Sequence, residues 1–244
     1  MLSQNACLKY NEFVQKYQLH IYPMLAERMQ RLFTECNVNR TLDLGIGPGD
    51  LTVFFAKQNV GQIDGLDINP FMLALANKKI ASHDLSDRVK LVQGDVHSLP
   101  YPDACFDLVF SYSCFHHWED PIQGLKECVR ILKEGGALYL VDSYSDVKAL
   151  LPQFQQQLDE YSYREIVKKA IEESIETSTI EQFLACASMS SYELRPVDFS
   201  EEELVAGIVY INYDNQLIID SPRPTLWELI YRKPYVNQQR KKLL

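Results

Sequence analysis

The sequence lacks the features that would place it in a membrane, a fibre or a disulfide-rich scaffold. No stretch of its 244 residues approaches the roughly 18 to 20 consecutive apolar residues that a membrane-spanning helix needs. It contains only 10 Gly and 11 Pro, too few for a low-complexity or collagen-like chain. With 46% apolar and 23% charged residues, it predicts a soluble globular chain with one large core or two small ones.

Cysteines are few and dispersed. The six of them form no CxxC pair, which favours free thiols in a reducing compartment over a disulfide framework. The first residues lack the basic and apolar regions of a secretory signal peptide. We therefore predict a cytoplasmic location.

Positive charge is also scarce. There are 24 Lys and Arg against 33 Asp and Glu, and the net charge of −9 argues against nucleic-acid binding, which needs clustered cations. Residues 155–205 hold twelve acidic and four basic residues, nearly the whole excess. The C-terminus is basic instead, with Arg232, Lys233, Arg240, Lys241 and Lys242. A solvated acidic face and a solvated tail are the simplest interpretations.

Hydrophobic periodicity divides a single predicted domain into four parts. Residues 1–37 predict N-terminal helices, with a kink or break at Pro23. Residues 38–145 alternate apolar runs with helical segments, the pattern of an α/β fold with a parallel sheet between helices. Residues 146–178 predict a helical lid insertion, and 179–244 a closing helix, strands and a basic tail.

The individual elements can be predicted from the same pattern. Strands are expected at 41–44, 62–66, 89–93, 106–111, 136–143, 192–196 and 207–212. Helices are expected at 50–57, 70–81, 121–132 and 180–187, with two amphipathic helices in the insertion that break near Ser162. The segment 226–235 is amphipathic and basic, and three roles are open for it: packing on the core, supporting a dimer, or meeting an acidic partner.

A glycine-rich turn follows the first predicted strand and precedes a helix. Its glycines, Gly45, Gly47 and Gly49, let the backbone approach a ligand closely, and the helix start offers N–H groups to an anion. Such a turn also occurs as a plain strand-to-helix connection. The turn alone is therefore weak evidence for a ligand.

Carboxylates follow the next two predicted strands. Asp67 stands 22 residues after Gly45, where a carboxylate can accept hydrogen bonds from ribose hydroxyls, and Asp95 follows the third strand. Either residue alone could be a helix N-cap. Because ligands of open parallel sheets lie beyond the carboxyl ends of the strands, these side chains and Asp43 are expected to converge on one crevice.

In their order and spacing, these segments resemble the class I methyltransferases that use S-adenosylmethionine, specifically their small, ubiquinone-biosynthesis-like members. The matching segments are 43–49, 65–70, 94–103, 106–111, 115–118 and 130–136. The resemblance implies a Rossmann-like, seven-stranded, mostly parallel sheet with helices on both faces. Glu134 stands where the family commonly has proline, which alters a turn and not the site.

The resemblance also implies a cofactor, S-adenosylmethionine, and residues that bind it. Asp43 would lie near the methionine ammonium, beside the turn glycines, and Asp67 would hold the ribose hydroxyls. Adenine would meet Ile68, Asp95 and Val96, and the transferable methyl would be bordered by Ser111 and Tyr112. The predicted cofactor residues are Asp43, Gly45, Gly47, Gly49, Asp67, Ile68, Asp95, Val96, Ser111 and Tyr112.

A nicotinamide enzyme is the competing nucleotide-binding interpretation. Its G-x-G-x-x-G fingerprint needs a third glycine where this chain has Asp50. An acidic residue at Asp43 also suits a cationic ligand group better than a pyrophosphate. Methyl transfer is therefore the favoured reaction.

Residues for the acceptor side are harder to predict. His116 and His117 are the candidate general bases, with a structural role at a helix start as the alternative. No metal is predicted, because adjacent His side chains diverge and no further ligands lie near in sequence. The predicted substrate and lid residues are Tyr10, Tyr17, Phe154, Tyr161 and Tyr163.

The predicted function is methyl transfer, by in-line displacement, to an O, N or C nucleophile of a small molecule. Two alternatives stay open: a peptide, protein or RNA acceptor, and a catalytically silent methyltransferase-like partner subunit. A homodimer is also open.

Overall fold

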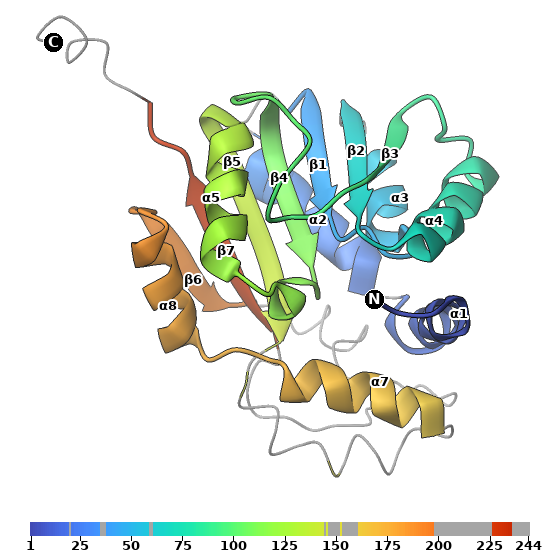
Figure 1. The fold of residues 1–244 in the computed structure, drawn as a ribbon. Coiled ribbons are helices and arrows are strands. Elements are labelled where there is room, and N and C mark those ends of the chain that lie inside the picture. The colour runs from blue at the N-terminus through green and yellow to red at the C-terminus, as the bar shows by residue number, and fades with distance from the viewer. Residues whose placement is uncertain are drawn as a thin grey trace, which may run out of the picture.

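The structure is a computed structural model of the 244-residue chain, shown in Figure 1. It describes residues 1–19, 21–34, 38–58, 61–143, 145, 152, 161–197 and 226–235. Phe154, the expected helix before Tyr161 and the expected strand at 207–212 lie outside these ranges. Within them, no helix has the length and apolar character to cross a membrane.

A seven-stranded sheet forms the centre of the molecule, with the strand order β3-β2-β1-β4-β5-β7-β6. The strands are β1 (Arg40–Leu44), β2 (Gln62–Asp67), β3 (Val89–Gln93), β4 (Phe106–Tyr112), β5 (Leu132–Ser143), β6 (Tyr192–Pro196) and β7 (Leu226–Arg232). The first five pair in parallel, and β7 runs antiparallel to both β5 and β6. The predicted α/β class with a mostly parallel sheet is confirmed.

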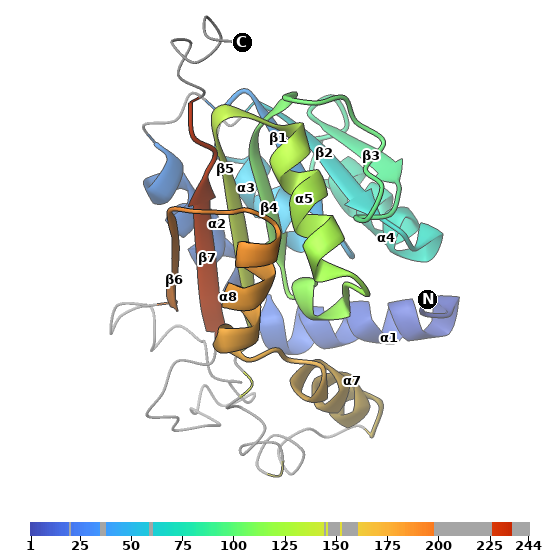
Figure 2. The ribbon, with the colours of Figure 1, turned by 60° about the vertical axis from the view of Figure 1, so that its left-hand side comes forward.

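Helices cover both faces of this sheet (Figures 1 and 2). One face carries α2 (Ile21–Phe33), α3 (Asp50–Ala56) and α4 (Pro70–Ser82). The other carries α5 (Pro121–Ile131) and α8 (Thr177–Cys186). Most strand ends match the predicted ranges within a residue or two, except that β5 begins four residues early.

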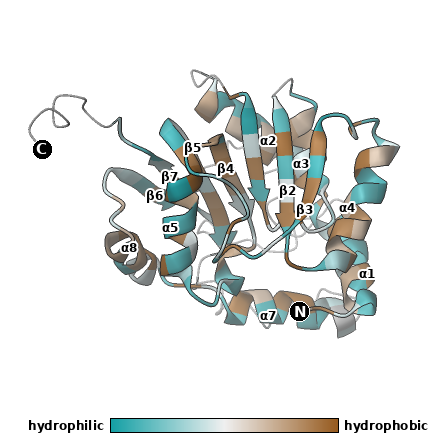
Figure 3. Ribbon diagram, turned by 45° about the horizontal axis from the view of Figure 1, so that its top comes forward, coloured by the Kyte–Doolittle hydropathy of each residue, from teal (hydrophilic) through white to brown (hydrophobic). Residues whose placement is uncertain are grey.

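Alternation along the central strands explains the two-sided core. In β4, Leu108 and Phe110 pack toward α2 and α3, whereas Val109 packs toward α5. Successive strand residues point to opposite faces, so a strand covered on both sides needs an unbroken apolar run. Figure 3 shows hydrophobic segments along the central strands, interrupted by hydrophilic ones, and both kinds of residue on the helices.

Two elements lie along the edge of the sheet where the parallel strands end. The N-terminal α1 (Gln4–Phe13) continues through a π-helical turn, η1 (Val14–Gln18), and α7 (Tyr161–Glu172) lies beside it (Figures 1 and 2). Pro23 lies in the first turn of α2, where proline is tolerated. The predicted kink or break at Pro23 therefore corresponds to the start of this helix. Helix α7 includes Ser162, so the described part begins one residue before the predicted break.

The segment 226–235 is the largest surprise of the fold. The sequence pattern predicted an amphipathic, basic segment here. In the structure, Leu226–Arg232 form β7, which lies between β5 and β6 and has six of its seven residues buried. Trp227 is 1% exposed and Leu229 is 0% exposed. Of the three roles open for this segment, the structure therefore supports packing on the core. The amphipathic interpretation was wrong, because both faces of β7 are covered.

Candidate functional site

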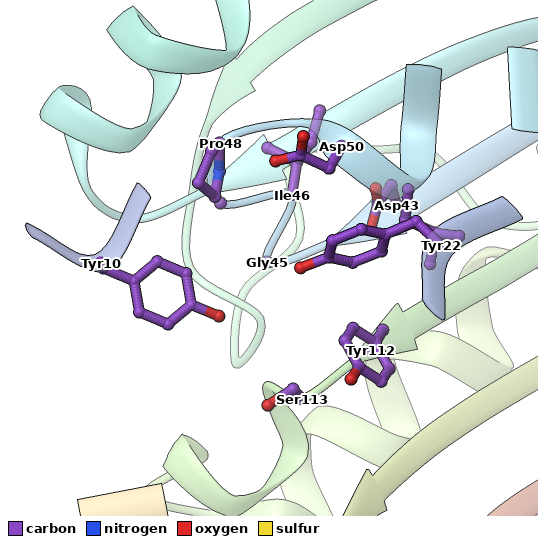
Figure 4. Close-up of a pocket in the computed structure, with 11 residues that line it drawn as sticks. Tyr10, Tyr22, Asp43, Gly45, Ile46, Pro48, Asp50, Tyr112 and Ser113 are labelled. Carbon is purple, nitrogen blue, oxygen red and sulfur yellow. The ribbon is translucent and has the colours of Figure 1, made fainter. Parts of the chain in front are cut away.

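A hollow of about 390 Å³, including its open mouth, lies where β1 and β4 end (Figure 4). Among its lining residues are five that the sequence predicted: Tyr10, Asp43, Gly45, Gly47 and Tyr112. Six others were not predicted: Tyr22, Ile46, Pro48, Asp50, Leu51 and Ser113. Of the three strand-end carboxylates that were expected to converge on one crevice, Asp43 lines this hollow, whereas Asp67 and Asp95 do not.

The glycine turn is held by hydrogen bonds to the end of β2. The N–H groups of Gly45 and Ile46 both donate to the carbonyl oxygen of Leu66, at 2.8 and 3.0 Å. Gly45, Gly47 and Gly49 have φ angles of +72°, +52° and +89°, a region that side chains disfavour. The turn thus needs glycine for its backbone conformation.

Alanine at Gly45 is expected to lower the free energy of unfolding by about 2–4 kcal/mol. A Cβ there would lie 2.3 Å from the Sγ of Cys114, and the φ angle adds strain. The matched control is Gly47→Ala, which has the same φ problem but open space around its Cβ. Urea unfolding should therefore show a clearly larger loss at Gly45, and equal losses would contradict the steric argument.

Asp43 places a carboxylate at the floor of the hollow. Its side chain extends from β1, the residue is 4% exposed, and it accepts a hydrogen bond from the Thr52 hydroxyl of α3. Burial raises its pKa to about 7, the Thr52 bond opposes this rise, and the neighbouring charge of Asp67 adds to it. Among the described residues no cationic side chain pairs with Asp43, so a ligand cation would find an available counter-charge here.

Asp67 ties the turn to the end of β2. One carboxylate oxygen accepts the N–H of Gly47 at 3.0 Å, and the other accepts the N–H of Asn69 at 2.8 Å. Burial raises its pKa, although these backbone N–H groups favour the charged form. Each carboxylate oxygen has two lone pairs. The N–H of Ile68 also contributes to holding the carboxylate in its charged form, and the oxygens keep acceptor capacity for a ligand hydroxyl.

Four other predicted cofactor residues lie outside the lining of the hollow. Ile68 is 49% exposed beside Asp67, and Gly49 is the N-cap of α3. Asp95 accepts the N–H of His97 at 2.9 Å in a turn without a following helix, and Val96 beside it is half-buried against the core. None of these four residues lines the hollow.

Ser111 does not border the hollow. It is 2% exposed, and its hydroxyl donates to the carbonyl oxygen of Leu44 at 2.7 Å, which joins β4 to β1. Ser113, two residues further along, takes the position at the rim. Strand β4 continues to Tyr112, one residue beyond its predicted end, so the residues at the rim lie further along the chain than expected.

His116 and His117 lie in a short 3₁₀ helix, η2 (Phe115–His117), beyond β4. The imidazole Nδ1 of His116 lies 2.8 and 2.9 Å from the two oxygens of Asp142, and His117 Nδ1 lies 2.7 Å from Glu173 Oε2. Burial would lower the pKa of His116, but Asp142 raises it overall. Neither histidine lines the hollow, and their role as bases stays a prediction.

The predicted lid aromatics separate into two groups. Tyr10 faces the hollow from α1 (Figure 4). Tyr17 and Tyr163 are buried instead, with ring centroids 5.6 Å apart in an edge-on contact, and both pack on Phe13. They join α7 to the N-terminal helices and do not line the hollow. Tyr161 is 74% exposed.

Tyr22 is the most prominent lining residue that sequence reasoning missed. It comes from α2, and its ring contacts that of Tyr112 edge-on at 5.6 Å (Figure 4). Asp50 is another of the six unpredicted lining residues, and it accepts hydrogen bonds from Gln15 at 2.8 Å and from Lys79. Tyr22 carries no local motif, because an aromatic residue on an apolar helix face has the pattern of core packing.

The central segment of the chain is similar to known methyltransferases. Residues 42–140 match the family model described as a methyltransferase domain. The demethylmenaquinone methyltransferase of Lactobacillus johnsonii is 42% identical over 104 residues, which cover 42% of this chain and 43% of that protein. The chain spans about half the length, or less, of the curated relatives that it matches.

Solved structures share the fold over nearly the whole chain. One is a protein of Methanococcus maripaludis whose proposed activity is S-adenosyl-L-methionine-dependent methyl transfer; it is 25% identical, with a TM-score of 0.69 over 97% of this chain and 95% of that one. The plantazolicin methyltransferase BpumL, in complex with SAH, has a TM-score of 0.71 at 18% identity, over 92% and 89%. The central segment, residues 42–140, therefore resembles S-adenosylmethionine-dependent methyltransferases, and the curated relatives that it matches include enzymes of ubiquinone and menaquinone biosynthesis.

Proposed function

We propose that the chain transfers a methyl group from S-adenosylmethionine to a small-molecule acceptor at the hollow beside the glycine turn. The observation that carries the proposal is the pair of carboxylates at adjacent strand ends. Asp43 is buried without a cationic partner in the described residues, and Asp67 keeps acceptor capacity beside the turn. This pair of acceptors fits a ligand with an ammonium at one end and a ribose diol at the other, because both ligand groups donate hydrogen bonds.

The cofactor would supply an electrophilic methyl group on a sulfonium, and the chain would bind and orient it. Asp43 would pair with its ammonium, Asp67 would accept its ribose hydroxyls, and the exposed Ile68 would offer an apolar contact to its base. Tyr10 and Tyr22 cover the turn from the N-terminal helices and would exclude water (Figure 4). Displacement at a sulfonium needs this positioning and no covalent enzyme intermediate.

A small acceptor is supported by the substrates named for relatives, such as demethylmenaquinone. Helix α7 lies across the same edge of the sheet, where it would act as part of the lid over that acceptor. The dispersed free cysteines of the described residues favour a reducing, cytoplasmic location. Isothermal titration with S-adenosylhomocysteine tests the proposal, and a folded chain that does not bind it would refute cofactor use.

Cofactor affinity is expected to rise as the pH increases from about 5.5 to about 8. In the free chain the pKa of Asp43 is raised to about 7, and a ligand ammonium would favour the carboxylate and lower this pKa. Binding below pH 7 should then release a proton. Calorimetry of S-adenosylhomocysteine binding in two buffers with different ionisation enthalpies measures that release.

Asp43→Asn is the control for this pH dependence. The variant should bind more weakly and lose most of the pH dependence. The raised pKa also means that the folded state retains a proton that the unfolded chain loses above about pH 4, so ionisable Asp43 destabilises the fold at neutral pH. The variant should therefore unfold at a higher temperature at pH 8. An affinity of the unaltered chain that does not change with pH would contradict the assignment of Asp43.

A further inference from the structure

Three potential metal ligands converge at the junction of η2 and α7. His116, His117 and Glu173 each offer a donor atom within 4.8 Å of the others, although Glu173 is 56 residues away in the sequence. The two imidazole rings do not diverge, as their adjacency suggested, but lie with centroids 3.9 Å apart. The described residues contain no second cluster of this kind. None of the three lines the proposed methyl-transfer hollow.

His116 is already oriented as a metal ligand. Its side chain is 2% exposed, and its Nδ1 lies within 2.9 Å of both oxygens of Asp142, which is 1% exposed. The Asp142 carboxylate also accepts the backbone N–H of His116 at 3.2 Å. A carboxylate that accepts from Nδ1–H leaves the lone pair of the neutral imidazole on Nε2.

The remaining nitrogen has nothing to bind in the described part of the chain. His116 Nε2 is buried and has no hydrogen-bond partner there, which is costly for a polar atom. The Asp142 carboxylate holds the other nitrogen of this imidazole, and histidines that bind metals commonly donate their second ring N–H to a carboxylate in the same way. A buried imidazole, an adjacent imidazole and a carboxylate also form the three-ligand set of zinc sites that keep a fourth position open.

From this geometry we propose that His116, His117 and Glu173 bind a divalent transition-metal ion of the Zn²⁺ class. Two neutral imidazoles and the carboxylates of Glu173 and Asp142 balance its charge. Lys169 Nζ lies 3.8 Å from Glu173 Oε1. The Lys169 side chain is 57% exposed, so this lysine can turn to solvent when an ion binds. The bound ion would fasten the end of α7 to η2 at the strand edge.

The test uses the full chain after treatment with a chelator, titrated with ZnCl₂ alone in competition with a chromophoric chelator. We expect one ion per chain. Glu173→Gln and His117→Ala should each weaken the binding by about a hundredfold, and Asp142→Asn by about tenfold or more. Co²⁺ should bind the unaltered chain with a visible d–d spectrum, which each ligand variant loses.

His97→Ala is the matched control, since His97 Nδ1 also pairs with an aspartate, Asp95, at 2.6 Å but has no third ligand. Its Zn²⁺ affinity should equal that of the unaltered chain. Circular dichroism identifies any variant that fails to fold, and the conservative Glu173→Gln keeps the side-chain volume. Zn²⁺ binding that is absent, or unchanged in Glu173→Gln and His117→Ala, overturns the proposal. Titration with S-adenosylhomocysteine is a separate measurement, so failure of either proposal is seen independently.

Discussion

Replacing Glu228 by alanine is expected to lower the free energy of unfolding by about 3–5 kcal/mol. Glu228 lies in β7, is 0% exposed, and accepts hydrogen bonds from Arg28 of α2 at 2.7 and 2.6 Å. Arg195 of β6 and the Tyr139 hydroxyl of β5 also donate to it, each at 2.8 Å. Without the carboxylate, a largely buried guanidinium and a buried hydroxyl lose their shared acceptor.

The size of this effect comes from the position of Glu228 in the sheet. Its partners lie on three elements besides its own, so one side chain joins α2 to β5, β6 and β7. Burial alone would raise the pKa of Glu228, but the hydrogen bonds from Arg28, Arg195 and Tyr139 hold it below its usual value. This stabilisation is present above the pKa of the unfolded carboxyl and is lost as the pH falls through the lower folded value.

Urea unfolding at pH 7 measures the loss, with Glu193→Ala as the control. Glu193 is on the neighbouring strand β6, pairs with the same Arg195, and has a side chain that is 61% exposed. An exposed pair of this kind contributes at most about 1 kcal/mol. Similar losses at the two positions would contradict the central role of the buried carboxylate.

Asp67→Ala is expected to weaken S-adenosylhomocysteine binding by about a hundredfold, close to 3 kcal/mol, through the loss of two charge-assisted hydrogen bonds. The variant also loses the contact to the N–H of Gly47, so the glycine turn becomes less well fixed. Calorimetry measures the affinity, and thermal unfolding confirms that the variant is folded.

Two further variants separate these causes. Asp67→Asn keeps an acceptor oxygen without the charge and should bind with intermediate affinity. Asp87→Ala removes an exposed carboxylate elsewhere and should bind like the unaltered chain. If Asp67→Ala binds within about threefold of the unaltered chain, the ribose assignment is wrong, because a charge-assisted bond alone is worth more.

The elements between residues 40 and 143 could be predicted well because their signals are local. Strand β3 has its predicted ends, and α5 ends one residue before its predicted end. Helices there begin at recognisable caps: Asn69 and Asp120 each precede a proline at the first helical position, and their side chains accept N–H groups of the first turn. Such rules depend on a few neighbouring residues, so one sequence contains them.

Residues 226–232 and the acceptor side could not be predicted in the same way. The side chain of Glu228 is charged, and a charge in a strand indicates an exposed face unless its partners are known. Those partners, Arg28 and Arg195, are distant in sequence. Likewise, the sequence positions of Tyr17 and Tyr163 are compatible with either a pocket wall or the core. Only their contact with each other in the folded chain shows that they are core residues.

The sequence by itself determined the α/β architecture, the glycine turn and the carboxylates at the strand ends, because backbone conformation and alternating burial are encoded within short segments. The tertiary structure alone decided that Asp67 holds the N–H of Gly47, that β7 lies inside the sheet, and that Glu173 meets His116 and His117. These features depend on residues brought together across the fold, where burial and pairing change what each side chain can do.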